Sequence, residues 1–121
     1  MFTITVETHF QASHQLVLPN GSKEPAHGHD WVVTTAVSSE KLDDTGVVMD
    51  FRTLREIVEN VTAELGNTVL SEVEHFRQNS PSAENVAMYI YDKLRVGLPG
   101  GVELQSIKVV EEPGCSAKFA E

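Results

Sequence analysis

The chain has 121 residues, of which 40% are hydrophobic and 22% are charged, a composition typical of one soluble globular domain. Its 18 acidic and 9 basic residues give a formal net charge of −9, which argues against nucleic acid as a partner because phosphate backbones would be repelled. The single cysteine, Cys115, excludes an internal disulfide. We see neither a signal peptide nor an apolar run of the roughly 20 residues that a membrane span needs. We therefore expect a cytoplasmic protein that spans no membrane.

Two β-strands are predicted at the start of the chain. Over residues 2–14 apolar and polar residues alternate, which is the pattern of a half-buried strand, and His14 lies on its apolar face. Residues 15–26 contain Pro, Asn-Gly and a second Pro and therefore predict a connection. Residues 27–40 are rich in β-branched residues and predict the second strand. The two strands are expected to form an antiparallel hairpin whose long connection can hold a ligand.

Two amphipathic helices and two more strands follow. Residues 47–65 predict the first helix, with Asp50 as its N-cap and with an apolar stripe formed by Phe51, Leu54, Val58, Val61 and Leu65. Residues 66–80 read as irregular, and a second helix opens at Pro81 and Ser82 and stops before Gly97. Residues 102–112 and 115–120 predict the last two strands. The order ββααββ indicates an α+β fold in one domain, residues 1–121.

The stretch HGHDW contains two histidines with the spacing of metal ligands. His27 and His29 are two residues apart in a predicted strand, so both imidazoles point to the same face. His14 lies near the end of the preceding strand, so pairing of the two strands can bring three imidazoles together. Three histidines hold Zn²⁺ with one coordination position left open, as in catalytic zinc sites. The spacing alone also allows ordinary strand histidines, and both interpretations stay open at this point.

Five segments together resemble one known family. HFQASH, HGHDW, TGVVMDFRTL, PSAEN and VVEE occur in the order and spacing of the 6-pyruvoyl-tetrahydropterin synthase family, which includes 6-carboxy-tetrahydropterin synthase. The similarity runs over nearly the whole chain. It implies the tunnelling fold, an antiparallel four-stranded sheet with two helices on one face. It also implies a homohexamer, a dimer of trimers, in which strands close into barrels and the active sites lie between subunits.

The resemblance also implies roles for individual residues. The three histidines named above would hold a zinc ion. Glu111 would bind the amino group and the ring N–H of a pterin-like substrate, because two carboxylate oxygens can accept hydrogen bonds from adjacent donors. The segment from Pro81 to Asn85 would complete the pterin pocket from a neighbouring chain, with contacts from Ser82, Ala83 and Glu84. Without the resemblance, Glu111 reads as a solvated acid at a strand end.

The chain departs from the family in the residues that transfer protons. The family relay resembles a trio of Cys, Asp and His, with the cysteine before H-G-H and the other two in an L-D-H segment after the first helix. Here the connection NGSKEPA has no cysteine, and the matching residues are Leu65, Gly66 and Asn67. Cys115 stands just past the last turn and does not replace the missing cysteine. Because Gly66 has no basic group and Asn67 is a very poor base, we do not expect the standard synthase reaction at the family's rate.

Glu24 remains as a candidate base. It stands three residues before His27, where part of the family resembles this pattern with Glu in place of Cys. Those members cleave the side chain of dihydroneopterin triphosphate to give 6-hydroxymethyl-dihydropterin, whereas an ordinary loop glutamate would simply be solvated. Three functions follow. The chain is a pterin-binding homologue without the standard reaction, a zinc-dependent carbon–oxygen or carbon–carbon lyase with Glu24 as base, or a zinc-free paralogue used for sensing or assembly.

Overall fold

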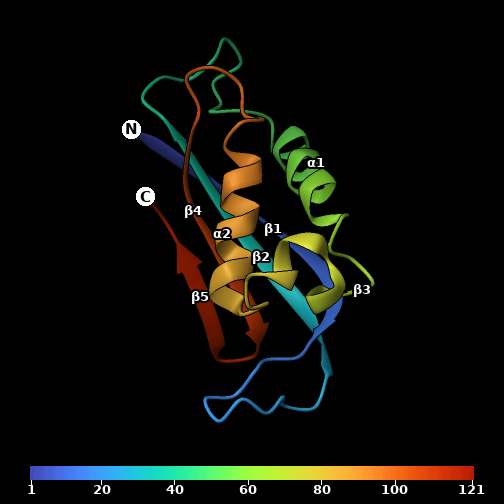
Figure 1. Ribbon diagram of the computed structural model, residues 1–121. Helices are drawn as coiled ribbons and strands as arrows, with labels where there is room; N and C mark the ends of the chain where they lie inside the picture. Colours follow the sequence, from blue (N-terminus) through green and yellow to red (C-terminus); the bar gives the residue numbers. More distant parts are fainter.

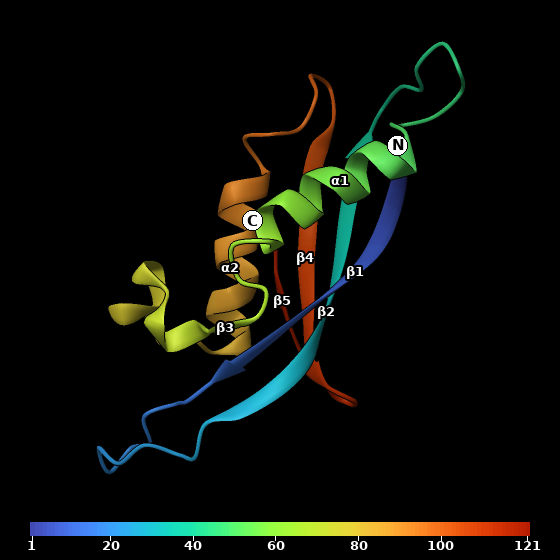
Figure 2. The same ribbon diagram turned by 90° about the vertical axis from the view of Figure 1, so that its right-hand side faces the viewer.

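The protein is described by a computed structural model of residues 1–121, in which one sheet carries two helices on one face (Figure 1). In chain order the elements are β1 (Phe2–His14), β2 (His27–Ser39), α1 (Phe51–Thr62), β3 (Thr68–Val69), the 3₁₀ turns η1 (Leu70–Glu72) and η2 (Glu74–Arg77), α2 (Ala83–Leu94), β4 (Glu103–Glu112) and β5 (Cys115–Phe119). The strand order is β3-β1-β2-β4-β5. Both helices lie on the same side of the sheet in the side view (Figure 2). The predicted α+β class is confirmed.

The first two strands form the predicted antiparallel hairpin. They pair along their whole length, from Phe2 opposite Ser39 to His14 opposite His27. The connection between them has its own backbone pairing, a bridge between Val17 and Lys23. Its tip turns at Gly21, which has a φ of +86°, a conformation that glycine adopts without strain. The connection is therefore an ordered arm beyond the end of the sheet.

The sheet has five strands, so the prediction of four was wrong in this respect. The additional strand, β3, pairs parallel to β1 through Ala12 and Ser13. It lies in residues 66–80, which were expected to be irregular and which also contain η1 and η2. A strand of two residues has no alternation to detect. Its place is fixed by the turn after α1, where Asn67 has a φ of +58° and its N–H donates to the carbonyl oxygen of Gln11 at 2.5 Å.

Helix α1 is shorter than predicted. Asp50 caps it as expected, because its carboxylate accepts from the N–H groups of Arg52 at 2.7 Å and Thr53 at 3.3 Å. The helix ends at Thr62 instead of continuing to residue 65, although Leu65 is fully buried as its place in the stripe implies. Phe51 does not belong to the buried stripe, since it is 57% exposed. It begins the helix at the end that lies away from α2 (Figure 2).

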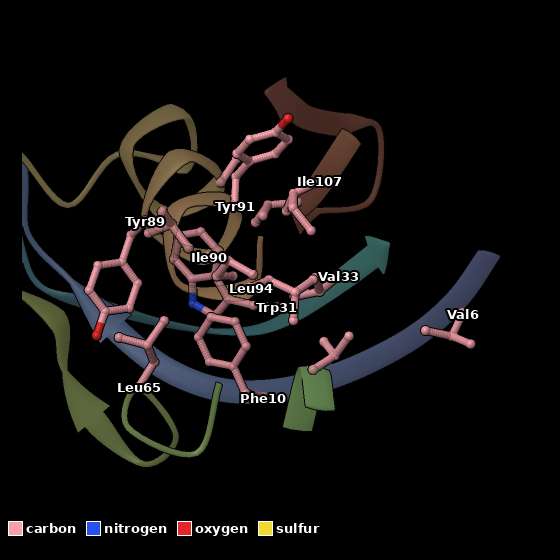
Figure 3. Packing of buried hydrophobic residues seen from close by; sticks show 14 of the residues in the cluster. Val6, Phe10, Trp31, Val33, Leu65, Tyr89, Ile90, Tyr91, Leu94 and Ile107 are labelled. Atoms are coloured by element: carbon pink, nitrogen blue, oxygen red, sulfur yellow. The ribbon is translucent and has the colours of Figure 1, made fainter. Parts of the chain in front are cut away.

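The core lies between the sheet and the helices (Figure 3). Trp31 is fully buried there and stacks on Phe10 with a ring-centroid distance of 5.9 Å. Tyr89 of α2 donates a hydrogen bond to Glu64 Oε2 at 2.7 Å, and burial together with this bond raises the pKa of Tyr89 to about 12. The phenol therefore stays protonated and links α2 to the segment after α1. No helix combines the length and the apolar character that crossing a bilayer requires.

Candidate functional site

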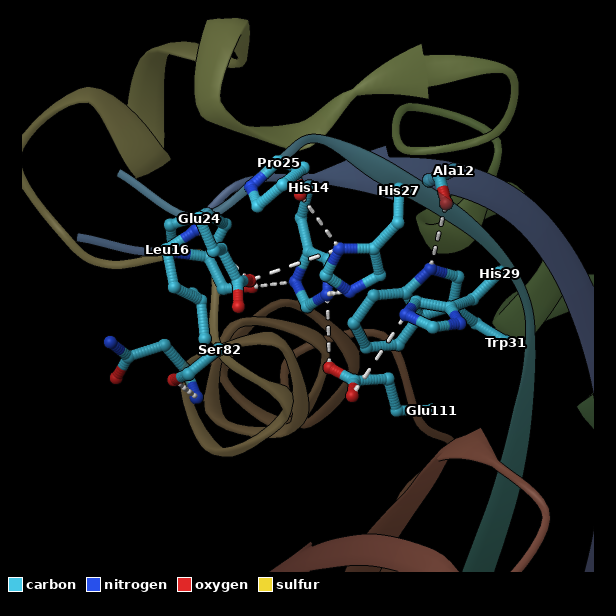
Figure 4. A network of polar contacts seen from close by, with 12 residues as sticks. Ala12, His14, Leu16, Glu24, Pro25, His27, His29, Trp31, Ser82 and Glu111 are labelled. Carbon is cyan, nitrogen blue, oxygen red and sulfur yellow. Dashed lines mark hydrogen bonds and ion pairs between the residues drawn. The ribbon is translucent and has the colours of Figure 1, made fainter. Parts of the chain in front are cut away.

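Four side chains from three strands converge at one end of the sheet (Figure 4). His14 ends β1, His27 and His29 begin β2, and Glu111 lies near the end of β4. One nitrogen or oxygen atom of each lies within 4.8 Å of the corresponding atoms of the others, so the group is able to hold a metal ion. We call these four residues the histidine cluster. The sequence prediction of a shared face for three histidines accounts for most of this geometry.

The strand pairing explains why the four side chains meet. His14 and His27 are directly opposite each other in the β1–β2 register, and His29 shares the face of His27 two residues later. Glu111 lies where the β4–β5 register shifts between Val110 and Glu112. Such bulges re-aim side chains and are frequent beside active sites. The last β2–β4 pair is Val32 with Val110, so Glu111 reaches the cluster from the next position along β4.

The orientation of two imidazoles is set by backbone carbonyl groups. His14 Nδ1 lies 2.8 Å from the carbonyl oxygen of Pro81, and His27 Nδ1 lies 3.1 Å from that of Pro25. A carbonyl oxygen only accepts hydrogen bonds, so each neutral ring carries its hydrogen on Nδ1 and a lone pair on Nε2. The two Nε2 atoms are 2.9 Å apart. Two lone pairs at this distance repel each other unless a cation lies between them, and carbonyl contacts to the other nitrogen are typical of metal-bound histidines.

His29 adds a third nitrogen with no partner of its own. Its side chain is 12% exposed, and its buried Nε2 atom makes no hydrogen bond. Burial lowers the pKa of His29, although the negative charge of Glu111 acts in the opposite direction. The lowered pKa favours the neutral ring, which is the form that binds a metal ion. An unpaired buried nitrogen is costly, and coordination of a metal ion would satisfy it. The donor set therefore fits a divalent ion such as Zn²⁺.

Glu111 lies closer to the histidines than the sequence indicated. Its Oε1 atom is 3.1 Å from His14 Nε2, and its Oε2 atom is 3.9 Å from His29 Nε2. The side chain is 23% exposed, so one side of the carboxylate is still open to a ligand. Binding of a pterin by Glu111 stays a prediction. Its position at the cluster was missed because the pairing of β2 with β4 has no local signal in the sequence.

Glu24 is fixed beside the cluster by the arm between β1 and β2. Its Oε1 atom accepts from the N–H of Leu16 at 3.2 Å and lies 3.9 Å from His27 Nδ1 (Figure 4). A second backbone bond, from Glu24 N–H to the carbonyl oxygen of Leu16 at 3.0 Å, holds the same pair together. The side chain is 26% exposed. The carboxylate is thus anchored and partly exposed, on the Nδ1 side of the His27 ring, whereas Nε2 of the same ring faces His14.

The segment from Pro81 to Asn85 touches the cluster within its own chain through the Pro81 carbonyl. Ser82 caps α2 by accepting from the N–H of Asn85 at 3.2 Å, Ala83 begins the helix, and Glu84 is exposed in its first turn. Their contacts with a pterin stay a prediction. The role of Pro81 was missed because a backbone carbonyl has no signature in the sequence.

The residues that match the family's relay offer no acid or base, although one of them, Asn67, lines the same hollow as His29 of the cluster. Leu65 is fully buried, and Asn67 is exposed and lines a hollow of about 390 Å³ with Gln11 and Asp30. His75 is exposed and packs against Tyr89 with a ring-centroid distance of 4.8 Å, and Cys115 is exposed at the start of β5. None of these residues adds an acid or a base to the cluster in this chain.

Comparisons with known proteins agree with the fold and identify the family. A profile of the 6-pyruvoyl tetrahydropterin synthase family matches residues 3–121. The 6-carboxy-5,6,7,8-tetrahydropterin synthase of Synechocystis sp. is 32% identical over 130 residues, which cover 98% of this chain and 93% of the relative. The dihydroneopterin monophosphate aldolase of Pyrococcus furiosus is 31% identical over 102 residues, which cover 84% of this chain and 82% of the relative. The solved structure of 6-pyruvoyl tetrahydropterin synthase from Caenorhabditis elegans has the same fold, with a TM-score of 0.86 at 23% identity over 99% of this chain and 95% of the other. The chain therefore belongs to the 6-pyruvoyl tetrahydropterin synthase family.

Proposed function

We propose that this chain binds a reduced pterin and cleaves a carbon–carbon bond in its side chain, with Glu24 as the proton-transfer group. The observation that carries this proposal is the position of Glu24, whose carboxylate is anchored 3.9 Å from His27 Nδ1. Residues 66 and 67, a glycine and an asparagine, offer no acid or base for the synthase relay. The Pyrococcus furiosus relative, named as an aldolase of dihydroneopterin monophosphate, supports a cleavage reaction.

A single carboxylate is sufficient for such a cleavage because the reaction involves no net uptake or loss of protons. Glu24 would take the proton of the side-chain hydroxyl on the second carbon from the ring. The bond between the first and second side-chain carbons then breaks, its electron pair moves toward the C=N group of the dihydropterin ring, and the outer fragment leaves as an aldehyde. The protonated Glu24 returns its proton to the first carbon, which gives a hydroxymethyl pterin. The same group serves as base and then as acid.

The cluster would supply the metal and part of the substrate site. A zinc ion held by His14, His27 and His29 would polarise an oxygen of the substrate. We assign Glu111 to the pterin, because three histidines already complete the protein ligands of an open zinc site and because a carboxylate matches adjacent N–H donors. Ser82, Ala83 and Glu84 would contribute the remaining pterin contacts.

Product analysis tests this function directly. We expect the purified protein, supplied with zinc, to convert dihydroneopterin monophosphate or triphosphate to 6-hydroxymethyl-dihydropterin, detected by chromatography with fluorescence after oxidation. Formation of a 6-pyruvoyl or 6-carboxy product at a comparable rate would contradict the proposal. Tight binding of a pterin without any product would instead favour a paralogue that uses the pocket for sensing or assembly.

The same proposal includes a homohexamer made of two trimers. The outer edge of β1 has a strand partner only at Ala12 and Ser13, and β5 pairs with β4 on one side only. Unpaired edges of this length invite pairing with other chains, and closure into a barrel would satisfy them. We expect light scattering at micromolar concentration to give a mass six times that of the 13.3 kDa chain. The mass of a single chain would contradict the assembly.

A further inference from the structure

The turn that leads into helix α2 places a backbone carbonyl group against the histidine cluster. Pro81 is buried, and its carbonyl oxygen accepts from His14 Nδ1 at 2.8 Å. This carbonyl is not used by the helix, because Pro81 precedes the N-cap residue Ser82, whose own carbonyl oxygen accepts from Val86 N–H at 2.9 Å. The direction of the Pro81 carbonyl therefore decides which nitrogen of the His14 ring carries the hydrogen.

Asn85 holds the chain on both sides of Pro81. Its side-chain Nδ2 atom donates to the carbonyl oxygen of Ser80 at 2.9 Å, and its backbone N–H donates to Ser82 Oγ at 3.2 Å. Proline fixes its own φ and restricts the residue before it to extended conformations, so few torsions of this turn remain free. The two bonds from Asn85 restrain those torsions, and with them the peptide group that carries the Pro81 carbonyl.

The side chain of Asn85 does not act as a helix cap. Asn85 is the third residue of α2, a position from which Glu or Gln commonly reaches back to accept from the N–H of the N-cap residue. Here the amide donates instead to a carbonyl two residues before the N-cap. This bond satisfies no backbone group of the helix and orders only the turn in front of it. Since that turn contains the carbonyl that contacts His14, the bond acts on the cluster.

We propose that Asn85 is a positioning residue for the histidine cluster. By restraining the Pro81 carbonyl, it keeps the hydrogen of the neutral His14 ring on Nδ1. The lone pair is then on Nε2, the atom that faces His27 Nε2 at 2.9 Å. A free lone pair that faces the other ligands is what binding of a metal ion requires of a histidine. The inference rests on the proposed function in one respect, since it takes the cluster as a metal site.

Two measurements on Asn85→Ala test this role without turnover. Alanine suits a helix and removes only the side-chain bond to Ser80, because the backbone N–H that donates to Ser82 remains. We expect zinc affinity, measured by competition with a chromogenic chelator, to fall about tenfold, the low end of the cost of losing a partner of a metal ligand.

The second measurement is the tautomer of His14 in the metal-free protein. Long-range ¹H–¹⁵N NMR of protein labelled with ¹⁵N-histidine, which has only five histidines, reports it at one pH well above the usual histidine pKa. We expect the Nδ1–H tautomer in the wild type and a mixture of both tautomers in Asn85→Ala. A role of Asn85 in stability alone would not change the tautomer of a folded protein.

Asn79→Ala is the matched control. Asn79 lies in the same segment, and its Nδ2 atom donates to the carbonyl oxygen of His75 at 2.8 Å, a bond of the same kind that does not involve Pro81. Its zinc affinity and its His14 tautomer should be those of the wild type. Asn85→Asp keeps the size of the side chain, but its carboxylate cannot donate, so it should behave as Asn85→Ala. Asn79→Asp controls for the added charge.

The outcomes separate this inference from the proposed function. Wild-type zinc affinity and a wild-type His14 tautomer in folded Asn85→Ala would show that the inference is wrong. Equal losses in Asn85→Ala and Asn79→Ala would also overturn it, because a general loss of order in the segment would then account for both. If the wild type binds no zinc while Asn85→Ala alone loses the Nδ1–H tautomer, the metal site of the proposed function fails and the positioning of His14 stands.

Discussion

Replacing Glu24 with glutamine is expected to slow side-chain cleavage by about 10²–10⁴-fold, the contribution of a positioned proton-transfer group. Glutamine keeps the shape of the side chain, and its amide oxygen can still accept from the N–H of Leu16, a bond of 3.2 Å in the wild type. The arm between β1 and β2 should therefore keep its structure. Because the pterin is assigned to Glu111, on a different strand, pterin affinity should be unchanged.

The measurement compares kcat with the dissociation constant of a pterin for each variant. Glu40→Gln is a matched control. Glu40 is an exposed acid that follows the last residue of β2, whereas His27 is the first residue of that strand. An unchanged kcat in Glu24→Gln would show that another group takes the proton. Loss of pterin binding would show that Glu24 belongs to the substrate pocket.

The sequence predicts most of the sheet because its longest strands are strictly patterned. The alternation over residues 2–14 has the same bounds as β1, and the pairing of β1 with β2 places His14 opposite His27. Periodicity gave less information where tertiary contacts decide the structure. Phe51 follows the helical spacing of buried residues but lies at the exposed start of α1, and β3 is held by the turn at Asn67 instead of by a pattern of its own.

The candidate site likewise combines residues that a local pattern predicts with groups that only tertiary contacts bring together. Three histidines can be placed on one face by counting, because side chains in a strand alternate with a period of two. Glu111 reaches them only because β4 pairs with β2, which are more than 60 residues apart in the chain. The Pro81 carbonyl that contacts His14 also comes from a distant segment, 67 residues along the chain. Sequence reasoning therefore recognised the side chains whose spacing is local and missed the groups that orient them.

Replacing His14 with alanine is expected to remove the metal site. His14 is fully buried. Its Nε2 atom lies 2.9 Å from His27 Nε2 and 3.1 Å from Glu111 Oε1, so His14 contacts two of the other three residues of the cluster. Loss of a supporting partner alone costs 10–100-fold in metal affinity, and loss of a ligand should cost more than about 100-fold. Calorimetric titration of the metal-free protein with zinc, together with the zinc content of the purified protein, measures this effect.

Thermal unfolding with and without zinc provides a second readout of the same prediction. Zinc at 100 times its dissociation constant would stabilise the wild type by about 2.7 kcal/mol, and His14→Ala should lose this gain. The alanine also leaves a cavity beside Trp31 and removes a hydrogen bond to Pro81, so the comparison is made within each variant, with and without zinc. His27→Ala, whose side chain is 39% exposed, removes a ligand with less damage to packing and should give the same loss. His9→Ala removes an exposed imidazole of β1 outside the cluster and should keep the full stabilisation by zinc. Equal stabilisation of all three variants by zinc would show that the metal binds elsewhere.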